Sequence, residues 1–156
     1  MEKNTELMSL RELTDALTAR DVLLKEKTEE ARVSLELFRS IFNMLPNPIV
    51  VTSAYTGLIE HVNKAFQDVT GYVECEVIGK SSLILYKDPK DRETIIEMVQ
   101  KEGQAKDIPV VFLHKNGSPI ECIMLVKPIT RDKLSVYLSL VERIGHRRAS
   151  DKEKEV

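Results

Sequence analysis

A chain of 156 residues with 42% hydrophobic and 31% charged residues has the composition of a folded protein, long enough for one domain with extensions. The formal net charge of −2 gives no reason to expect a nucleic-acid partner, which would require clustered basic residues. No apolar run approaches the roughly 20 residues that span a bilayer, and two cysteines make no disulfide framework, so we expect a cytoplasmic chain without a membrane segment. A membrane-bound parent protein stays an alternative if the chain is a fragment.

The N-terminal part, residues 1–36, is predicted to be an amphipathic, coiled-coil-like helix that continues to about Leu45. A hydrophobic stripe with a seven-residue period is typical of helices that pair. The stripe consists of Leu10, Leu17, Leu24, Ala31 and Phe38, and its companion positions in the middle hold Thr14, Asp21 and Thr28. A lone helix of this kind is marginal in water, so the stripe predicts a parallel homodimer. The alternative is that the helix folds back on its own domain.

The next segment, residues 45–80, is predicted to form two short strands and two short helices. The apolar, β-branched run 48–52 reads as a buried strand, Gly57 supplies a turn, and residues 58–62 form the second strand. Asn63 stands at the N-cap position of a helix over 64–70, where its side-chain oxygen can accept a hydrogen bond from a first-turn amide. Gly71 ends that helix, and a helical turn follows over 74–78.

The remaining segment is predicted to contain one longer helix and three strands. Asp88-Pro89 caps a helix over 90–102, and strands follow over 108–113, 120–126 and 134–141. Asn116-Gly117 predicts a type I′ hairpin turn with positive φ at both residues, and residues 128–133 are predicted to be a second turn. Alternation places Ile120, Cys122, Met124 and Val126 on one face of their strand. The fold class is therefore α+β, a five-stranded antiparallel sheet with short helices on one face. Residues 144–156 are predicted to be a charged, flexible tail.

The pieces NPIVV, GLIEHVNKAF and GYVECEVIGK, in this order and spacing, resemble the opening of a PAS domain. The resemblance continues to about Arg143, so residues 37–143 are predicted to be the domain. It implies a role in sensing and relay, and it implies that the helix over 90–102 forms one wall of an internal cavity. The candidate pocket-lining residues are Asn63, Ile95, Met98, Val99, Cys122 and Met124. The alternative is that they only fill the core, and that Asn63 is only a helix cap.

Residues with catalytic or metal-binding patterns are missing from the sequence. His61, His114 and His146 stand outside any ligand spacing, and Cys75 lies between two glutamates, which disfavour a reactive thiolate. We therefore predict that the chain is not an enzyme. The histidine that haem-binding PAS domains carry on the helix before the hairpin is absent from 90–102, and Cys75 does not match the flavin-binding motif of light-sensing members. Neither haem nor flavin is predicted, and the cofactor stays unknown.

The sequence thus predicts a sensory PAS module in intracellular signal transduction. It would bind a small ligand or a partner and relay the change through a dimeric N-terminal helix, with a signalling protein as a further partner. The alternative function is a constitutive protein-interaction or dimerisation module that binds no small molecule.

Overall fold

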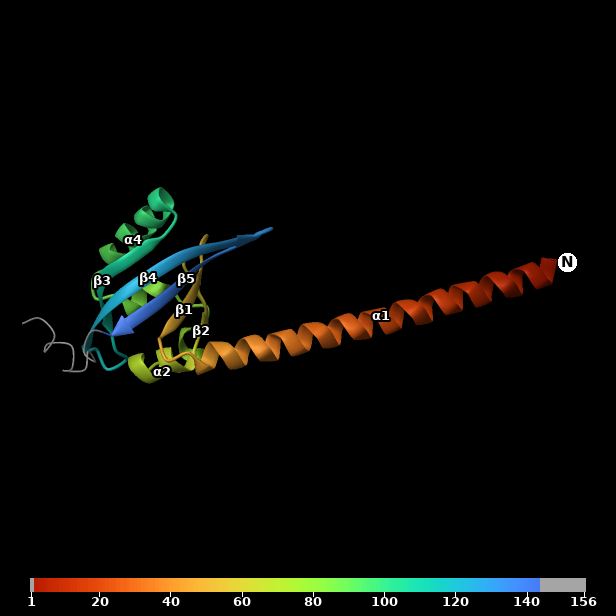
Figure 1. Ribbon diagram of the computed structural model, residues 1–156, viewed down its shortest axis with the longest axis horizontal. Helices are drawn as coiled ribbons and strands as arrows, with labels where there is room; N and C mark the ends of the chain where they lie inside the picture. Colours follow the sequence, from red (N-terminus) through yellow and green to blue (C-terminus); the bar gives the residue numbers. More distant parts are fainter. Residues whose placement is uncertain (1, 144–156) are drawn as a thin grey trace, which may run out of the picture. The chain divides into compact units, whose positions relative to one another are not determined.

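A computed structural model of the chain describes residues 2–143. It contains two compact units, of which the first is residues 2–41 and the second begins at Phe42. The predicted long helix is confirmed as α1 (Glu2–Met44), whose last turn belongs to the second unit (Figure 1). The predicted tail, residues 144–156, lies outside the described residues, as does His146.

Five antiparallel strands build one sheet, as predicted. In chain order they are β1 (Ile49–Ser53), β2 (Ile59–Val62), β3 (Ala105–Leu113), β4 (Pro119–Arg131) and β5 (Leu134–Arg143). Their order across the sheet is β2-β1-β5-β4-β3, so the first and last strands of the domain are hydrogen-bonded neighbours at its centre. Each strand alternates its side chains between the two faces. Val50 of β1 therefore belongs to one apolar cluster, whereas Ile49 and Val51 belong to another.

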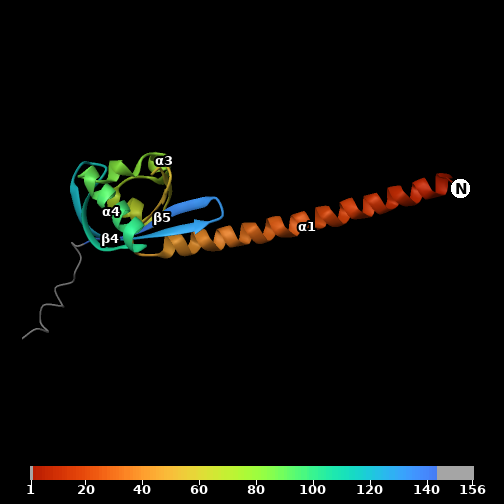
Figure 2. The same cartoon turned by 90° about the horizontal axis from the view of Figure 1, so that it is seen from above.

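Four short helices pack over one face of the sheet (Figure 2). They are α2 (Lys64–Thr70), α3 (Glu74–Val77), the 3₁₀ helix η1 (Ser82–Leu85) and α4 (Pro89–Glu102). The predicted caps are confirmed for α4, where the Asp88 side chain accepts a hydrogen bond from the Lys90 amide at 3.0 Å and Gly103 has a φ of +80°. The main core fills the space between these helices and the sheet, and its most completely buried side chains include Phe66, Leu85, Ile95 and Met124.

The turn between β3 and β4 differs from the predicted type I′ turn. Among residues 2–143, only Asp107 and Asp132 are non-glycine residues with positive φ, so Asn116 does not adopt the required conformation. The backbone of His114 accepts from the Gly117 amide at 2.7 Å and donates to Ser118 at 2.8 Å, which makes a three-residue loop. A loop of this length needs only one left-handed residue, and Gly117 provides it with a φ of +87°.

The predicted turn over residues 128–133 is also wrong, because β4 continues through Pro128 to Arg131. Pro128 pairs with Tyr137 of β5, whereas the pairing of β4 with β3 ends at Val126. Among residues 2–143, therefore, no strand pairs with Pro128 on the side away from β5. A proline without an amide hydrogen is tolerated where no neighbouring strand needs that hydrogen. The chain reverses only at Asp132, which has a φ of +53°.

Gly71, which ends α2, makes a close contact that a larger residue would disturb. It has a φ of +77°, and a Cβ atom there would lie 2.6 Å from the imidazole of His114. Gly103 has a similar φ but open space around it, so it is a matched control. We expect Gly71→Ala to lower the free energy of unfolding by about 3 kcal/mol and Gly103→Ala by about 1 kcal/mol, as measured by urea denaturation.

The double variant Gly71→Ala/His114→Ala separates the contact from the backbone strain. In a protein that already carries His114→Ala, the Gly71→Ala substitution should lower the free energy of unfolding by about as much as Gly103→Ala does. Equal losses for the two single glycine variants would contradict the assigned contact.

Candidate functional site

The side-chain amide of Asn63 joins three parts of the domain. Its Oδ1 accepts from the Phe66 amide at 3.0 Å, as the predicted cap requires, and also from the Ile49 amide at 2.9 Å. Its Nδ2 donates to the carbonyls of Phe42 at 3.1 Å and Asn47 at 2.9 Å. An amide side chain has two donor hydrogens and one oxygen that accepts two bonds, so Asn63 is fully paired. The predicted cap is thus also the connection between α1, β1 and α2.

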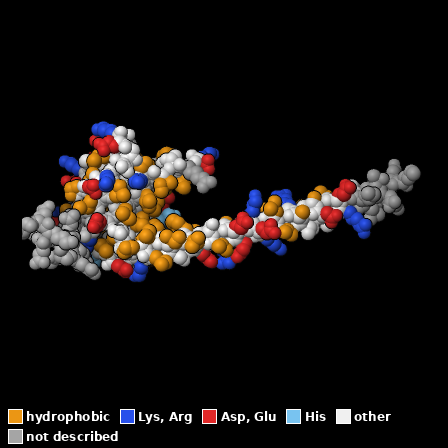
Figure 3. All heavy atoms as spheres, viewed as in Figure 1, with side chains coloured by type: hydrophobic (Ala, Val, Ile, Leu, Met, Phe, Trp, Pro, Cys, Tyr) orange, Lys and Arg blue, Asp and Glu red, His pale blue; other side chains and the backbone are white. Residues whose placement is uncertain are grey.

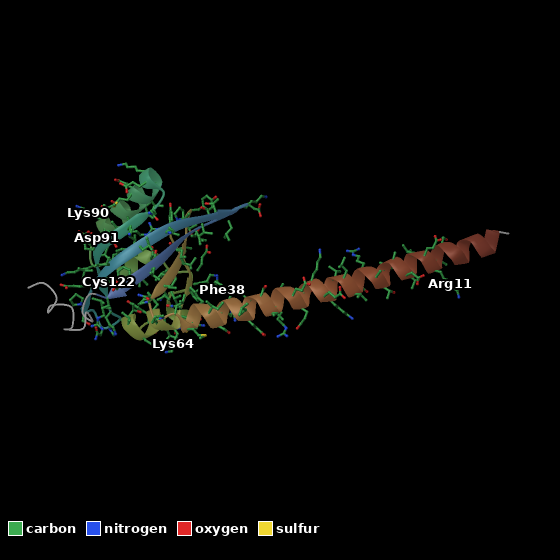
Figure 4. The ribbon with its side chains drawn as sticks, viewed as in Figure 1. Arg11, Phe38, Lys64, Lys90, Asp91 and Cys122 are labelled. Carbon is green, nitrogen blue, oxygen red and sulfur yellow. The ribbon has the colours of Figure 1, made fainter. Side chains whose placement is uncertain are left out.

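A second asparagine makes the reciprocal contact. The side-chain oxygen of Asn43, in the last turn of α1, accepts from the amide of Lys64 at 2.9 Å. Figure 4 labels Lys64 at the start of α2. We call Asn43 and Asn63 together the asparagine clasp. Because each residue pairs with the backbone of the other's helix, the last turn of α1 and the first turn of α2 are joined twice.

The ring of Phe42 packs on the opposite face of the sheet from the main core. It is 8% exposed and contacts a group that we call the outer cluster. The outer cluster consists of the buried residues Phe42, Ile49, Val51 and Val136 and the partly buried residues Leu138 and Leu140. Figure 3 shows hydrophobic side chains gathered over this part of the sheet. The end of α1 is therefore held by its backbone at the clasp and by its side chain on the sheet.

The predicted pocket-lining residues fall into two groups. Ile95, Val99, Cys122 and Met124 are buried together in the main core. Met98 is partly buried and packs against that core, whereas Asn63 lies at the junction with α1 and has no unpaired polar atom. In the first group, Ile95 and Val99 of α4 are buried in the same core as Cys122 and Met124 of β4.

Two aromatic residues that the sequence analysis did not single out belong to this core. The hydroxyl of Tyr86 donates to the sulfur of Met124 at 3.8 Å, and its ring meets Phe112 edge to face at a centroid distance of 5.1 Å. Burial raises the pKa of Tyr86 to about 12, so the hydroxyl stays protonated at neutral pH. Tyr86 follows η1, outside any periodic segment, and no sequence signal marked it. The Tyr86 hydroxyl is thus a polar group in an otherwise apolar region, and the sulfur that accepts its hydrogen bond is only a weak acceptor.

A small recess opens beside this core, between α4, β3 and β4. It has a volume of about 260 Å³, and Asp91, Val110, Glu121 and Cys122 are among its lining residues. Figure 4 labels Asp91 on α4 and Cys122 on β4. Burial raises the pKa of the Cys122 thiol to about 11, whereas Cys75 on α3 is exposed. Pockets for drug-sized ligands usually measure roughly 300 to 1,000 Å³, so the recess suits a smaller molecule.

The stripe on α1 is open to solvent on the single chain. Leu17 and Leu24 are each 51% exposed, and Leu10, Ala31 and Phe38 are also exposed. The threonines between them are satisfied locally, because the hydroxyls of Thr14 and Thr28 donate to the carbonyls four residues earlier, at 2.8 and 2.7 Å. The stripe therefore presents apolar side chains to solvent, and the hydroxyls of Thr14 and Thr28 are paired within the helix.

Residues 2–143 contain neither a membrane-spanning helix nor a cluster of metal-binding side chains. No helix in that range is long and apolar enough to cross a membrane. No three histidine, cysteine, aspartate or glutamate side chains in that range are grouped closely enough to hold a metal ion.

The sequence model of the family described as "PAS domain" matches residues 46–142, more than half of the chain. The chain belongs to the PAS domain family. The matched region begins just before β1 and ends in β5, so this PAS domain contains the complete sheet together with Asn63. The clasp partners Phe42 and Asn43 precede the matched region.

Three similar proteins place the PAS domain among its relatives. The blue-light-activated histidine kinase of Brucella anthropi is 27% identical over 129 residues, which are 76% of this chain but 26% of that protein. A solved PAS domain from Colwellia psychrerythraea is 25% identical with a TM-score of 0.62 and covers 70% of this chain and 96% of its own. The PAS domain of an HTR-like protein from Haloarcula marismortui is 21% identical with a TM-score of 0.66. The match covers 77% of this chain and 99% of that domain. These relatives support a sensory signalling module, and the chain spans about a quarter of the kinase's length.

The clasp geometry predicts unequal costs for losing its two asparagines. Asn63→Ala would leave buried donors and acceptors unpaired, and we expect it to lower the free energy of unfolding by about 3 kcal/mol or more. Asn43 is exposed and accepts one hydrogen bond, from the amide of Lys64 at 2.9 Å, so Asn43→Ala should cost about 1 kcal/mol. Urea denaturation of both variants measures the difference, and equal losses would contradict the central place of Asn63.

Proposed function

We propose that the chain is a cytoplasmic sensory PAS module that binds a small ligand or a partner and relays the change through a dimeric N-terminal helix. One observation carries this proposal: the Asn63 amide bonds the end of α1, the start of β1 and the first turn of α2 together. Any change in packing that moves one of these segments acts on the other two. We take residues 1–36 as the helix, 37–143 as the sensor domain and 144–156 as the tail.

The proposed ligand site is the part of the main core between α4 and β4. Its lining residues would be Ile95, Met98, Val99, Cys122 and Met124, with the Tyr86 hydroxyl as the polar group that orients a small, mostly apolar ligand. Asn63 lies at the edge of this region and acts in the relay. Phe66 connects the two, because its side chain is completely buried in the core and its amide bonds to Asn63.

The proposed mechanism is a shift between two packings. A ligand changes the balance only by the difference in its affinity for the two states. Repacking against Phe66 would move α2, and the clasp would pass that displacement to the last turn of α1. The stripe formed by Leu10, Leu17, Leu24, Ala31 and Phe38 would then carry the change along a parallel pair of helices.

The proposal assigns this chain no catalytic step. The Brucella protein is named a blue-light-activated histidine kinase, but this chain corresponds to only 26% of that protein. We therefore do not extend the kinase activity or the response to blue light to this chain. The exposed position of Cys75 gives no support to a covalent flavin attachment at that residue. Haem and flavin are not part of the proposal.

A second candidate function is a constitutive interaction module without a small-molecule ligand. The observation that favours it is the filled core: Ile95, Val99, Cys122 and Met124 are each less than 5% exposed and pack in one cluster, and the recess beside them is small. In this case the helix pair would form permanently, and α1 and the outer cluster would only present binding surfaces.

Cysteine cross-linking tests the parallel helix pair. In a Cys75→Ser background, we expect Leu17→Cys and Leu24→Cys each to form a symmetric disulfide under mild oxidation, because equivalent stripe positions in a parallel pair lie within the roughly 4.4–6.8 Å Cα separation that a disulfide needs. Ala19→Cys, on the other side of the helix, should stay monomeric on a non-reducing gel. Cross-linking at Ala19 as fast as at Leu17, or at neither stripe site, would contradict the pair.

Native mass spectrometry of the purified full chain, with an absorption spectrum, separates the two candidate functions. Sensing predicts a bound small molecule or a rise in melting temperature with a member of a metabolite panel, since a ligand that binds only the folded state stabilises it. Such a ligand should also change the cross-linking rate of the Leu24→Cys variant. An unchanged rate despite binding would contradict the relay, and no binding at all would favour the constitutive module.

A further inference from the structure

The charges on α1 are sorted by their position around the helix. Between residues 9 and 40, every basic side chain lies in one of the two columns that border the hydrophobic stripe. One column holds Arg11, Lys25, Arg32 and Arg39, and the other holds Arg20 and Lys27. The acidic residues of the same span lie on the outer side of the helix, except Asp21, which is in the stripe's companion column. Figure 3 shows basic and acidic side chains along α1.

Self-pairing of this helix would bring like charges together. In a parallel heptad pair, the residue before each companion position lies opposite the partner residue five positions later. This geometry places Arg20 against the partner's Lys25, and Lys27 against the partner's Arg32. Two-fold symmetry repeats each pair, so four like-charge contacts border the middle of the stripe.

Contacts within the helix neutralise only part of this charge. Arg32 bonds to Glu29 and Glu36, each at 2.6 Å, so its charge is largely compensated. Among the described residues, Arg20, Lys25 and Lys27 form no ion pair. Asp21 would lie beside the partner's Arg20 and offset one charge on each chain. The flanks of the paired middle section therefore stay net positive.

We propose that the second copy of this chain docks on the α1 stripe under electrostatic control, so that pairing is weak at low ionic strength and strengthens when anions screen the flanking basic residues. This inference rests on the proposed helix pair and adds its regulation. The hydrophobic stripe supplies the attraction, which salt does not weaken, whereas the Arg20, Lys25 and Lys27 charges supply a repulsion that salt removes. The expected salt dependence is opposite to that of a dimer held by ion pairs.

Sedimentation equilibrium of the full chain tests the sign of the salt effect. Between about 0.05 M and about 1 M NaCl the Debye length falls to about 3 Å, less than the separation of the flanking charges. Four like-charge contacts border the middle of the stripe, and the ion pairs of Arg32 weaken two of them, so we expect the dimer dissociation constant to fall about fivefold. A constant that is unchanged or larger at high salt would overturn the inference but leave the pair itself intact. No self-association at any salt concentration would overturn both.

A pair of variants with the same change in net charge separates flank repulsion from general salting-out. Lys25→Gln removes a positive charge beside the stripe, whereas Ala19→Glu adds a negative charge on the outer side of the helix. At low salt, Lys25→Gln should tighten the dimer about threefold and reduce its salt dependence, and Ala19→Glu should change neither. Circular dichroism confirms equal helix content. Equal effects of the two variants would overturn the inference.

Discussion

The buried amide of Asn63 is the interaction on which the rest of the domain's organisation depends. An amide presents its donors and acceptors in fixed directions, and burial is tolerated only where every one of them has a partner. The partners of Asn63 are backbone groups at Phe42, Asn47, Ile49 and Phe66. These four groups come from three segments of the chain, namely the end of α1, the residues that lead into and begin β1, and α2, so satisfying one side chain fixes the positions of several elements.

Phe42 shows why this junction can communicate with both faces of the sheet. Its carbonyl bonds to Asn63, and its ring packs in the outer cluster with Ile49 and Val51. The neighbouring residue Val50 points into the main core. A single short strand thus contacts both apolar layers at the point where α1 ends. The last turn of α1 is therefore joined to the PAS domain by hydrogen bonds and by packing together.

The helix and the domain follow different physical rules. Within the domain, packing against distant residues determines the conformation, as the contact of Tyr86 with Met124 shows. Along α1, the exposed stripe and its charged borders are set by spacing in the sequence, because residues three and four apart share one side of a helix. In the proposed helix pair, repulsion along the borders of the stripe would oppose the hydrophobic attraction along it, and salt would change the balance between them.

Features that depend on neighbours within a few residues were predictable from the sequence. The caps at Asn63 and Asp88, the helix ends at Gly71 and Gly103, and the shared face of Ile120, Cys122, Met124 and Val126 all followed from local hydrogen bonds or alternation. The turn at Asn116-Gly117 and the strand through Pro128 did not, because loop length and the absence of a β3 neighbour decided them.

For the candidate site, the sequence by itself determined that Ile95, Val99, Cys122 and Met124 are apolar and correctly spaced to face one core, and that Asn63 caps a helix. Only the tertiary structure decided that the other side of the Asn63 amide holds Phe42 and Asn47, and that the Tyr86 hydroxyl reaches Met124. The physical reason is that these partners are separated by 16 to 38 residues along the chain. No local pattern encodes a contact that exists only after the sheet and helices have assembled.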